Sequence, residues 1–232
     1  VGGIMNGTCN YILDNMTRLG LGYDEALKQA QKLGYAEANP ATDVDGIDTW
    51  HKVILSANVA FGISLDKTTV PVSGIRNISA ADVDCFKAHG KVCKLISTAK
   101  RTEDGFSAYV QPTLVAAGSP EGAVPLNYNL ITFIGQTSER MSFYGQGAGR
   151  YPTAYNVVQD LVDVTQGKSF YAPYGAPQAA DNQEAHRYYV RGNWEGSIQE
   201  DWSTGVVTAP VPVSQMHQWV KDHPDAFIAA VD

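Results

Sequence analysis

Apolar side chains recur every three or four positions in the first part of the chain, and they form short or alternating runs after about residue 68. The first spacing is that of one face of an amphipathic helix, and it predicts helices at 8–19, 23–33 and 45–60. The later pattern predicts further helices at 80–88, 152–164 and 214–221 and strands at 70–78, 92–99, 107–115, 130–134, 141–144 and 187–191. Helices followed by strands favour an α+β fold, with a mostly antiparallel sheet covered by helices.

Residues that begin or end helices stand at the expected places. Thr8 can cap the first helix, and Gly20, Gly34 and Gly62 follow the three early helical patterns. Pro152 suits the first turn of the late helix, because the amide hydrogen that proline lacks has no partner there. The boundaries and the periodicity therefore support the same division of the chain.

Composition excludes several classes of protein. The chain has 232 residues and a formal net charge of −7, with acidic and basic residues interspersed, so no basic face for nucleic acid is expected. No apolar run approaches the roughly 18 residues that a membrane span needs. Cys9, Cys85 and Cys93 lack a short pairing or a nearby histidine, which predicts buried thiols without a disulfide or metal site. This usage is typical of a cytoplasmic protein.

The segment from Gly34 to Lys52, GYAEANPATDVDGIDTWHK, carries the densest group of ionisable side chains. Asp48 and Lys52 stand four residues apart and share one face of a predicted helix, where partial shelter would let the lysine exchange protons. Glu37 and Asp43, in the preceding loop, could hold an ammonium group. The alternative is structural: a carboxylate at the helix start and an exposed ion pair.

Two glycine-containing segments are candidates for backbone contacts with a ligand. Gly147, Ala148 and Gly149 precede the late helix, whose free amide groups and positive dipole end suit a polar or anionic ligand. Gly7 and Thr8 stand at a strand-to-helix junction and offer amide groups and a hydroxyl. A plain tight connection explains the first segment equally well, and its spacing is not that of a dinucleotide-binding loop.

These segments together resemble the homoserine dehydrogenase family. The resemblance rests on GIMNGTCNYIL at 3–13, on the block at 34–52, and on GQGAGRYPTA at 145–154, in that order. It covers about residues 1–166, and the middle block is highly specific. Cys9 stands where the family has Thr, and Asn39 stands where Asp is common, which removes one charge from the loop.

The resemblance implies the NAD(P)-dependent interconversion of L-homoserine and L-aspartate 4-semialdehyde, a step of threonine and methionine biosynthesis. Lys52 would give and take the proton at the hydroxyl or aldehyde oxygen, with Asp48 positioning it. The residues implied to bind the substrate come from two segments: Gly7, Thr8, Tyr35, Glu37 and Asp43. Gly147, Ala148 and Gly149 would approach the nicotinamide end of the cofactor.

The resemblance also implies parts that this sequence lacks. The family's nucleotide-binding domain, which would hold most of NAD or NADP, has no counterpart here, so the chain alone is expected to be inactive. Residues 1–166 would form the catalytic domain, with helix 150–166 packed on the nucleotide-binding domain, and 167–232 an extension of unclear role. The sheet would pair two copies into a homodimer.

Two other interpretations fit the same sequence. One is a related amino-acid dehydrogenase with an altered substrate, which Asn39 makes conceivable. The other is a dimerisation module without catalysis, for which the segment from Glu37 to Lys52 would be dispensable.

Overall fold

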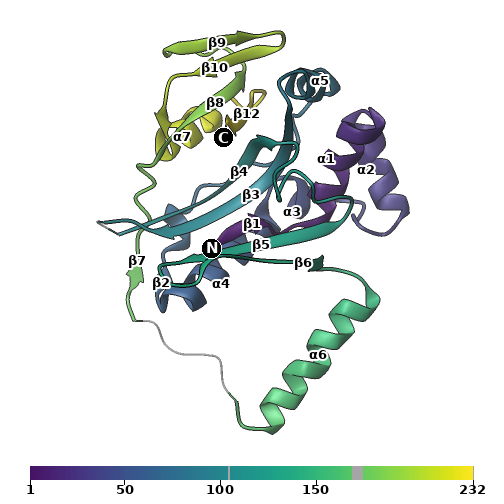
Figure 1. Ribbon diagram of the computed structural model, residues 1–232, viewed down its shortest axis with the longest axis vertical. Helices are drawn as coiled ribbons and strands as arrows, with labels where there is room; N and C mark the ends of the chain where they lie inside the picture. Colours follow the sequence, from purple (N-terminus) through teal and green to yellow (C-terminus); the bar gives the residue numbers. More distant parts are fainter. Residues whose placement is uncertain (104, 169–174, 232) are drawn as a thin grey trace.

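The computed structural model describes residues 1–103, 105–168 and 175–231, and its described part is built on one large twisted sheet (Figure 1). Nine strands follow one another across this ten-stranded sheet in the order β6 (Glu139–Gln146), β5 (Tyr128–Gly135), β1 (Gly2–Ile4), β3 (Lys91–Arg101), β4 (Phe106–Ala116), β12 (Phe227–Val231), β8 (Ala185–Arg191), β10 (Gly205–Thr208) and β9 (Ile198–Trp202). The tenth, β11 (Val211–Pro212), pairs with β8. Every neighbouring pair in the sheet is antiparallel except β12 with β4, which confirms the predicted fold class.

Four helices enclose the main core on one side of this sheet. They are α1 (Gly7–Leu19), α2 (Tyr23–Lys32), α4 (Ile47–Phe61) and α5 (Ala80–Ala88), of which three lie against the sheet itself and α2 lies against α1. Residues Ile12, Leu13 and Met16 of α1 are almost completely buried there, at the spacing that predicted the helix. The short helices α3 (Ala41–Val44) and η1 (Lys67–Thr69) lie in the connections before and after α4.

The C-terminal residues extend the same sheet and cover part of its opposite face. Side chains alternate along a strand, so Tyr189 of β8 joins the main core while Tyr188 belongs to a second cluster. That second cluster includes Met216 of α7 (Val213–Asp222). The presence of α7 confirms the prediction of a helix at 214–221. The described strands β8, β9, β10 and β12 of this region therefore belong to the same sheet as β4.

The strand predicted at 70–78 is wrong. Only Val72 forms a ladder contact there, an isolated bridge to Val110, and the rest is irregular. Pro71 has no amide hydrogen for a ladder, and a side chain at Gly74 would collide with the carbonyl of Val44 at 2.1 Å. The buried residues of this segment instead hold the connection between α3 and α4.

The helix predicted at 45–60 starts later than expected. Gly46 has a φ of 82°, a left-handed conformation that interrupts the chain between α3 and α4. A separate two-stranded parallel pair, β2 (Ser64–Leu65) with β7 (Pro177–Gln178), lies apart from the large sheet. Within the described residues, no helix is both long enough and apolar enough to cross a membrane.

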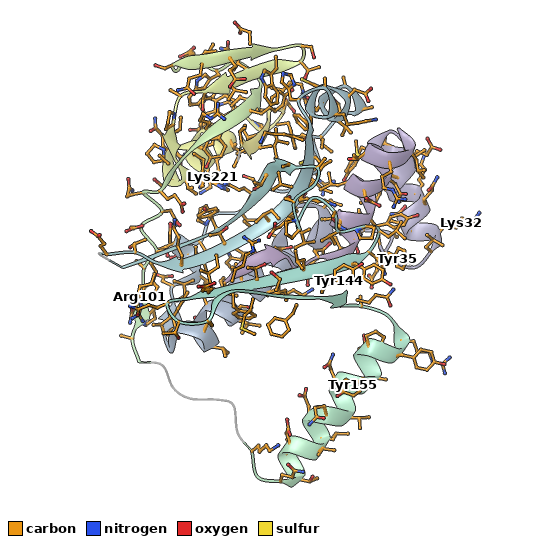
Figure 2. All side chains as sticks on the ribbon, in the orientation of Figure 1. Lys32, Tyr35, Arg101, Tyr144, Tyr155 and Lys221 are labelled. Carbon is orange, nitrogen blue, oxygen red and sulfur yellow. The ribbon has the colours of Figure 1, made fainter. Side chains whose placement is uncertain are left out.

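One helix stands apart from the core. Helix α6 (Arg150–Thr165) projects from the end of β6, and Figure 2 shows Tyr155 on it, away from the sheet and its covering helices. Its apolar side chains remain exposed, including Tyr155 at 69% and Leu161 at 61%. The prediction of a helix is confirmed here, whereas burial of its apolar side is not seen within the described residues.

Candidate active site

The candidate site begins where β1 passes into α1. Gly3 has a φ of 123°, and a side chain there would meet the carbonyl of Leu130 at 2.1 Å, so only glycine fits between β3 and β5. Asn6, and not Thr8 as predicted, caps α1 by accepting a hydrogen bond from the backbone amide of Cys9 at 2.7 Å. This junction fixes the Asn6 side chain next to the connection between α3 and α4.

The α3–α4 connection brings two carboxylates to the same place. Gly46 turns the chain, and a side chain at this position would press on Val72. Arg76 holds the turn from outside through two hydrogen bonds to Asp45, each of 2.8 Å. Asp43, at the end of α3, and Asp48, in the first turn of α4, consequently face the start of α1.

Four side chains form a continuous hydrogen-bonded chain there. The Asn6 amide donates to Oδ1 of Asp43 at 2.8 Å and to Oδ2 of Asp48 at 2.9 Å. Lys52 Nζ donates to the same Oδ2 of Asp48 at 2.6 Å and to the carbonyl of Met5 at 3.1 Å. The ammonium group therefore points toward the carboxylates, and its side chain is still 46% exposed.

Burial shapes the chemistry of this group. Desolvation raises the pKa of Asp43, and the hydrogen bond from Asn6 acts in the opposite direction. Burial also raises the pKa of the Cys9 thiol well above its usual range, and neighbouring carboxylates, first Asp43, add to this effect. The thiol stays protonated and donates to the carbonyl of Asp43 at 3.1 Å.

The remaining substrate-binding candidates surround this chain of contacts. Thr8 donates its hydroxyl to the carbonyl of Tyr35 at 2.7 Å, which ties α1 to the segment after α2. Gly7 lies against the carbonyl of Asn127, where a side chain would clash at 2.6 Å. Glu37 is exposed, and its charge acts on Asp43. All these candidates belong to one neighbourhood at the start of α1.

The predicted cofactor contacts lie in the turn between β6 and α6. A side chain at Gly147 would collide with the amide of Asn129, while Gly149 has a φ of 121°. Oδ1 of Asn129 is buried, and no described residue donates a hydrogen bond to it. Among the described residues no hydrogen bond joins Gly147, Ala148 or Gly149 to Lys52. The turn and the start of α1 nevertheless lie at the same end of β5, since Gln146 pairs with Tyr128 and Gly7 lies against Asn127.

Sequence reasoning missed Asn6 as a member of the site. The motif around Gly7 and Thr8 had been interpreted through its backbone amides and hydroxyl, whereas the side chain that contacts both carboxylates precedes it. The available signal was the residue type, since asparagine both caps a helix and carries two donors. The contact with Asp43 and Asp48 depends on tertiary structure.

Comparisons with known proteins agree on one family. The model of the homoserine dehydrogenase family matches residues 1–162. The homoserine dehydrogenase of Bacillus subtilis is 40% identical over 178 residues, which are 74% of this chain and 41% of that protein. That of Lactococcus lactis subsp. lactis is 36% identical over 212 residues, covering 88% of this chain and 48% of that protein.

Solved structures give the same result. The crystal structure of a homoserine dehydrogenase from Thiobacillus denitrificans has a TM-score of 0.79 and 29% sequence identity, covering 100% of this chain and 63% of that one. This chain spans less than half the length of the two curated relatives named above. It belongs to the homoserine dehydrogenase family.

Proposed function

We propose that this chain is the substrate-binding and catalytic part of an NAD(P)-dependent oxidoreductase that interconverts L-homoserine and L-aspartate 4-semialdehyde. The observation that carries the proposal is the chain of contacts from Asp43 through Asn6 and Asp48 to Lys52, in a member of this family. It gathers two carboxylates and one ammonium group, the charges that a small amino-alcohol needs. Threonine and methionine biosynthesis in the cytoplasm is the corresponding role.

Lys52 is the proposed proton donor and acceptor at the substrate oxygen. Its Nζ donates to Oδ2 of Asp48 at 2.6 Å and to the Met5 carbonyl at 3.1 Å, which fixes the ammonium group beside the carboxylates. From there it would give a proton to the oxygen when the aldehyde is reduced, and it would stabilise the negative charge that develops there. In the reverse direction the neutral amine takes the hydroxyl proton.

Asp43 and Glu37 are the proposed partners of the substrate's ammonium group. Asn6 occupies Oδ1 of Asp43, and no described residue donates to its Oδ2, which leaves that oxygen for the ligand. Gly7, Thr8 and Tyr35 would form the wall beside them, since the Thr8–Tyr35 contact closes this side. Binding the substrate through its amino end would orient the hydroxyl toward Lys52.

The chain's own contribution to cofactor binding would be limited to Gly147, Ala148 and Gly149. The amide of Asn129 lies beside this turn with its nitrogen toward Gly147. Its buried oxygen, which accepts no hydrogen bond from the described residues, fits a ligand that brings an N–H donor, such as the nicotinamide carboxamide. NAD or NADP, when bound, supplies a hydride acceptor. A nucleotide-binding region outside this chain would hold the rest of it.

The exposed parts of the chain support two further proposals on assembly. Helix α6, with Val158 and Leu161 exposed, would pack on the nucleotide-binding region, so that residues 1–166 work as one catalytic domain. The sheet would pair with that of a second copy, and the exposed apolar residues Met141 and Phe143 of the edge strand β6 favour such contacts.

The test is steady-state turnover by the protein that joins this chain to its nucleotide-binding region. We expect homoserine oxidation with NAD or NADP, little turnover of aspartate, and no activity of residues 1–232 alone. Turnover of aspartate in preference to homoserine would favour the related dehydrogenase with an altered substrate. A folded protein that oxidises neither compound would contradict the proposal.

A further inference from the structure

The side chain of Asn6 makes three of the four hydrogen bonds that an amide can make. Its oxygen accepts from the Cys9 amide at 2.7 Å, and its nitrogen donates to Asp43 and Asp48 at 2.8 and 2.9 Å. The residue is 5% exposed, so water does not replace these partners easily. One buried amide therefore connects a helix start to two carboxylates that repel each other.

We infer that Asn6 is a positioning residue for the reaction, which holds Asp43 toward the ammonium group of the substrate and Asp48 toward Lys52. The inference rests on the proposed function, since it assigns a role within the same site. Its physical basis is that the amide supplies both carboxylates with a donor from one rigid position. Without it, Asp43 would be free to turn toward water or toward Lys52, and Asp48 would be held by Lys52 alone.

Helix capping alone does not explain this residue. A cap needs only an acceptor for the Cys9 amide, and serine or threonine supplies one about as well as asparagine. The two donated bonds are additional, and both end on ionisable groups that the proposed reaction uses. A serine hydroxyl has one hydrogen and a shorter reach, so it would keep the cap and lose the bridge.

The charges around Asp43 determine how such a change would be detected. Asp48 and Lys52 face it from α4, Glu37 acts from the preceding loop, and Cys9 contacts it from α1. Because the Asn6 bond lowers the pKa of Asp43 against the effect of burial, its loss raises that pKa further. Binding of a substrate ammonium group would then weaken at a higher pH than in the original protein.

The experiment compares Asn6→Ser and Asn6→Thr with the original protein, in the form that carries both this chain and its nucleotide-binding region. Ser79→Ala is the control for a lost helix cap outside the site. The Ser79 hydroxyl caps α5 by accepting from the Asp82 amide and donates to the Asp82 carboxylate, so this substitution removes two bonds that the proposed reaction does not use. The readouts are kcat and KM for homoserine, the pH dependence of kcat/KM, and thermal unfolding.

We expect both Asn6 variants to fold and to lose kcat/KM by a factor on the order of 10², through a raised KM and a lowered kcat. The acidic limb of the kcat/KM profile should move to higher pH. Ser79→Ala should lower the unfolding temperature and leave both kcat/KM and the profile unchanged.

Three results would overturn the inference. The first is that the Asn6 variants have the same kinetics and pH profile as Ser79→Ala. The second is that they have a lower kcat/KM while the pH profile is unshifted. The third is that neither variant folds, which would make the Asn6 amide a requirement of the fold. The failure of the proposed function looks different: the unaltered protein itself would not oxidise homoserine.

Discussion

Helices α1 and α6 have similar apolar periodicity and opposite surroundings. In α1 the apolar residues Ile12 and Met16 are at most 1% exposed, because the sheet and α2 cover them. In α6 the corresponding residues Val158 and Leu161 are 59% and 61% exposed. Apolar periodicity thus predicts where a helix forms, but it does not show which surface covers the apolar side. Within the described residues, no such surface covers α6.

The polar groups at the starts of α1 and α6 also differ in whether they have hydrogen-bond partners within the described residues. At α1 the Asn6 amide, Asp43, Asp48 and Lys52 are mutually hydrogen-bonded. At α6 no side chain caps the helix, and the nearby amide oxygen of Asn129 is buried without a partner in the described part. The polar groups proposed for the substrate are therefore bonded to one another within this chain, whereas the buried oxygen near the proposed cofactor contacts has no partner among the described residues.

The largest effect on stability is expected at α5, a helix that is partnered within the chain as α1 is. Its Asp82 is fully buried and accepts hydrogen bonds from Arg191 and Tyr189 of β8. Asp82→Ala leaves the guanidinium without its partner and should lower the free energy of unfolding by about 3–5 kcal/mol. Urea unfolding measures this.

Asp84→Ala is the control for that measurement. Asp84 is on the same helix, and its exposed contact with Lys87 spans 3.8 Å. Its removal should change the free energy of unfolding by less than about 0.5 kcal/mol. Equal effects of the two substitutions would contradict the close connection between α5 and the C-terminal strands.

A matched pair of leucine substitutions tests the comparison of α1 with α6 directly. Leu13→Ala removes buried methyl groups from α1 and should lower the free energy of unfolding of this chain by about 3 kcal/mol. Leu161→Ala should change it by less than about 0.5 kcal/mol, because that side chain lies in water.

The same two leucine substitutions, made in the protein that includes the nucleotide-binding region, test whether α6 packs on that region. If α6 packs on that region, Leu161→Ala should then destabilise the protein by an amount closer to the effect of Leu13→Ala. An unchanged small effect in the longer protein would contradict the proposed packing of α6.

The smallest effect on the free energy of unfolding is expected from removing the charge of Asp43. The folded protein holds the pKa of this carboxyl above its value in the unfolded chain, so ionisation of Asp43 opposes folding. Protonated Asp43 makes its full contribution to stability below the pKa that this carboxyl has in the unfolded chain. That contribution is lost as the pH rises through the pKa in the folded protein. Asp43→Asn should therefore match the original stability at low pH and exceed it slightly near neutrality.

Urea unfolding of both proteins across the acidic and neutral range checks that pH dependence. The raised pKa of Asp43 would be contradicted if Asp43→Asn were less stable than the original protein at neutral pH. It would also be contradicted if the free energies of unfolding differed by the same amount at every pH. The substitution should also weaken homoserine binding in the longer protein, so stability and function would change in opposite directions.

Much of the fold could be predicted because burial and periodicity coincide in this chain. Helices α1, α2, α5 and α7 and the long strands β3 and β4 were predicted within a few residues of their bounds. Strand β12 was missed, since a run of five buried apolar residues, Phe227–Val231, carries no period that distinguishes strand from helix. Strand β9 was missed because its largely exposed and mostly polar residues give little alternation, and β10 because its four residues, Gly205–Thr208, are too few to show a period.

The site was predictable where its residues are close in sequence. The spacing of Asp48 and Lys52 on one helix indicated their contact, which has a distance of 2.6 Å. Contacts of Asn6 with Asp43 and Asp48 span 37 and 42 positions, and local patterns do not determine which side chains such separations bring together. They depend on how α1 packs against the turn at Gly46.

The central claim is that Lys52 handles a proton at the substrate oxygen, and its substitution tests that claim most directly. Lys32, which Figure 2 shows extending outward from α2, supplies a control of the same residue type. In the protein with its nucleotide-binding region, Lys52→Ala should lower kcat for homoserine by a factor of about 10² or more, and Lys32→Ala should leave it unchanged. Equal turnover by the two variants would contradict the account.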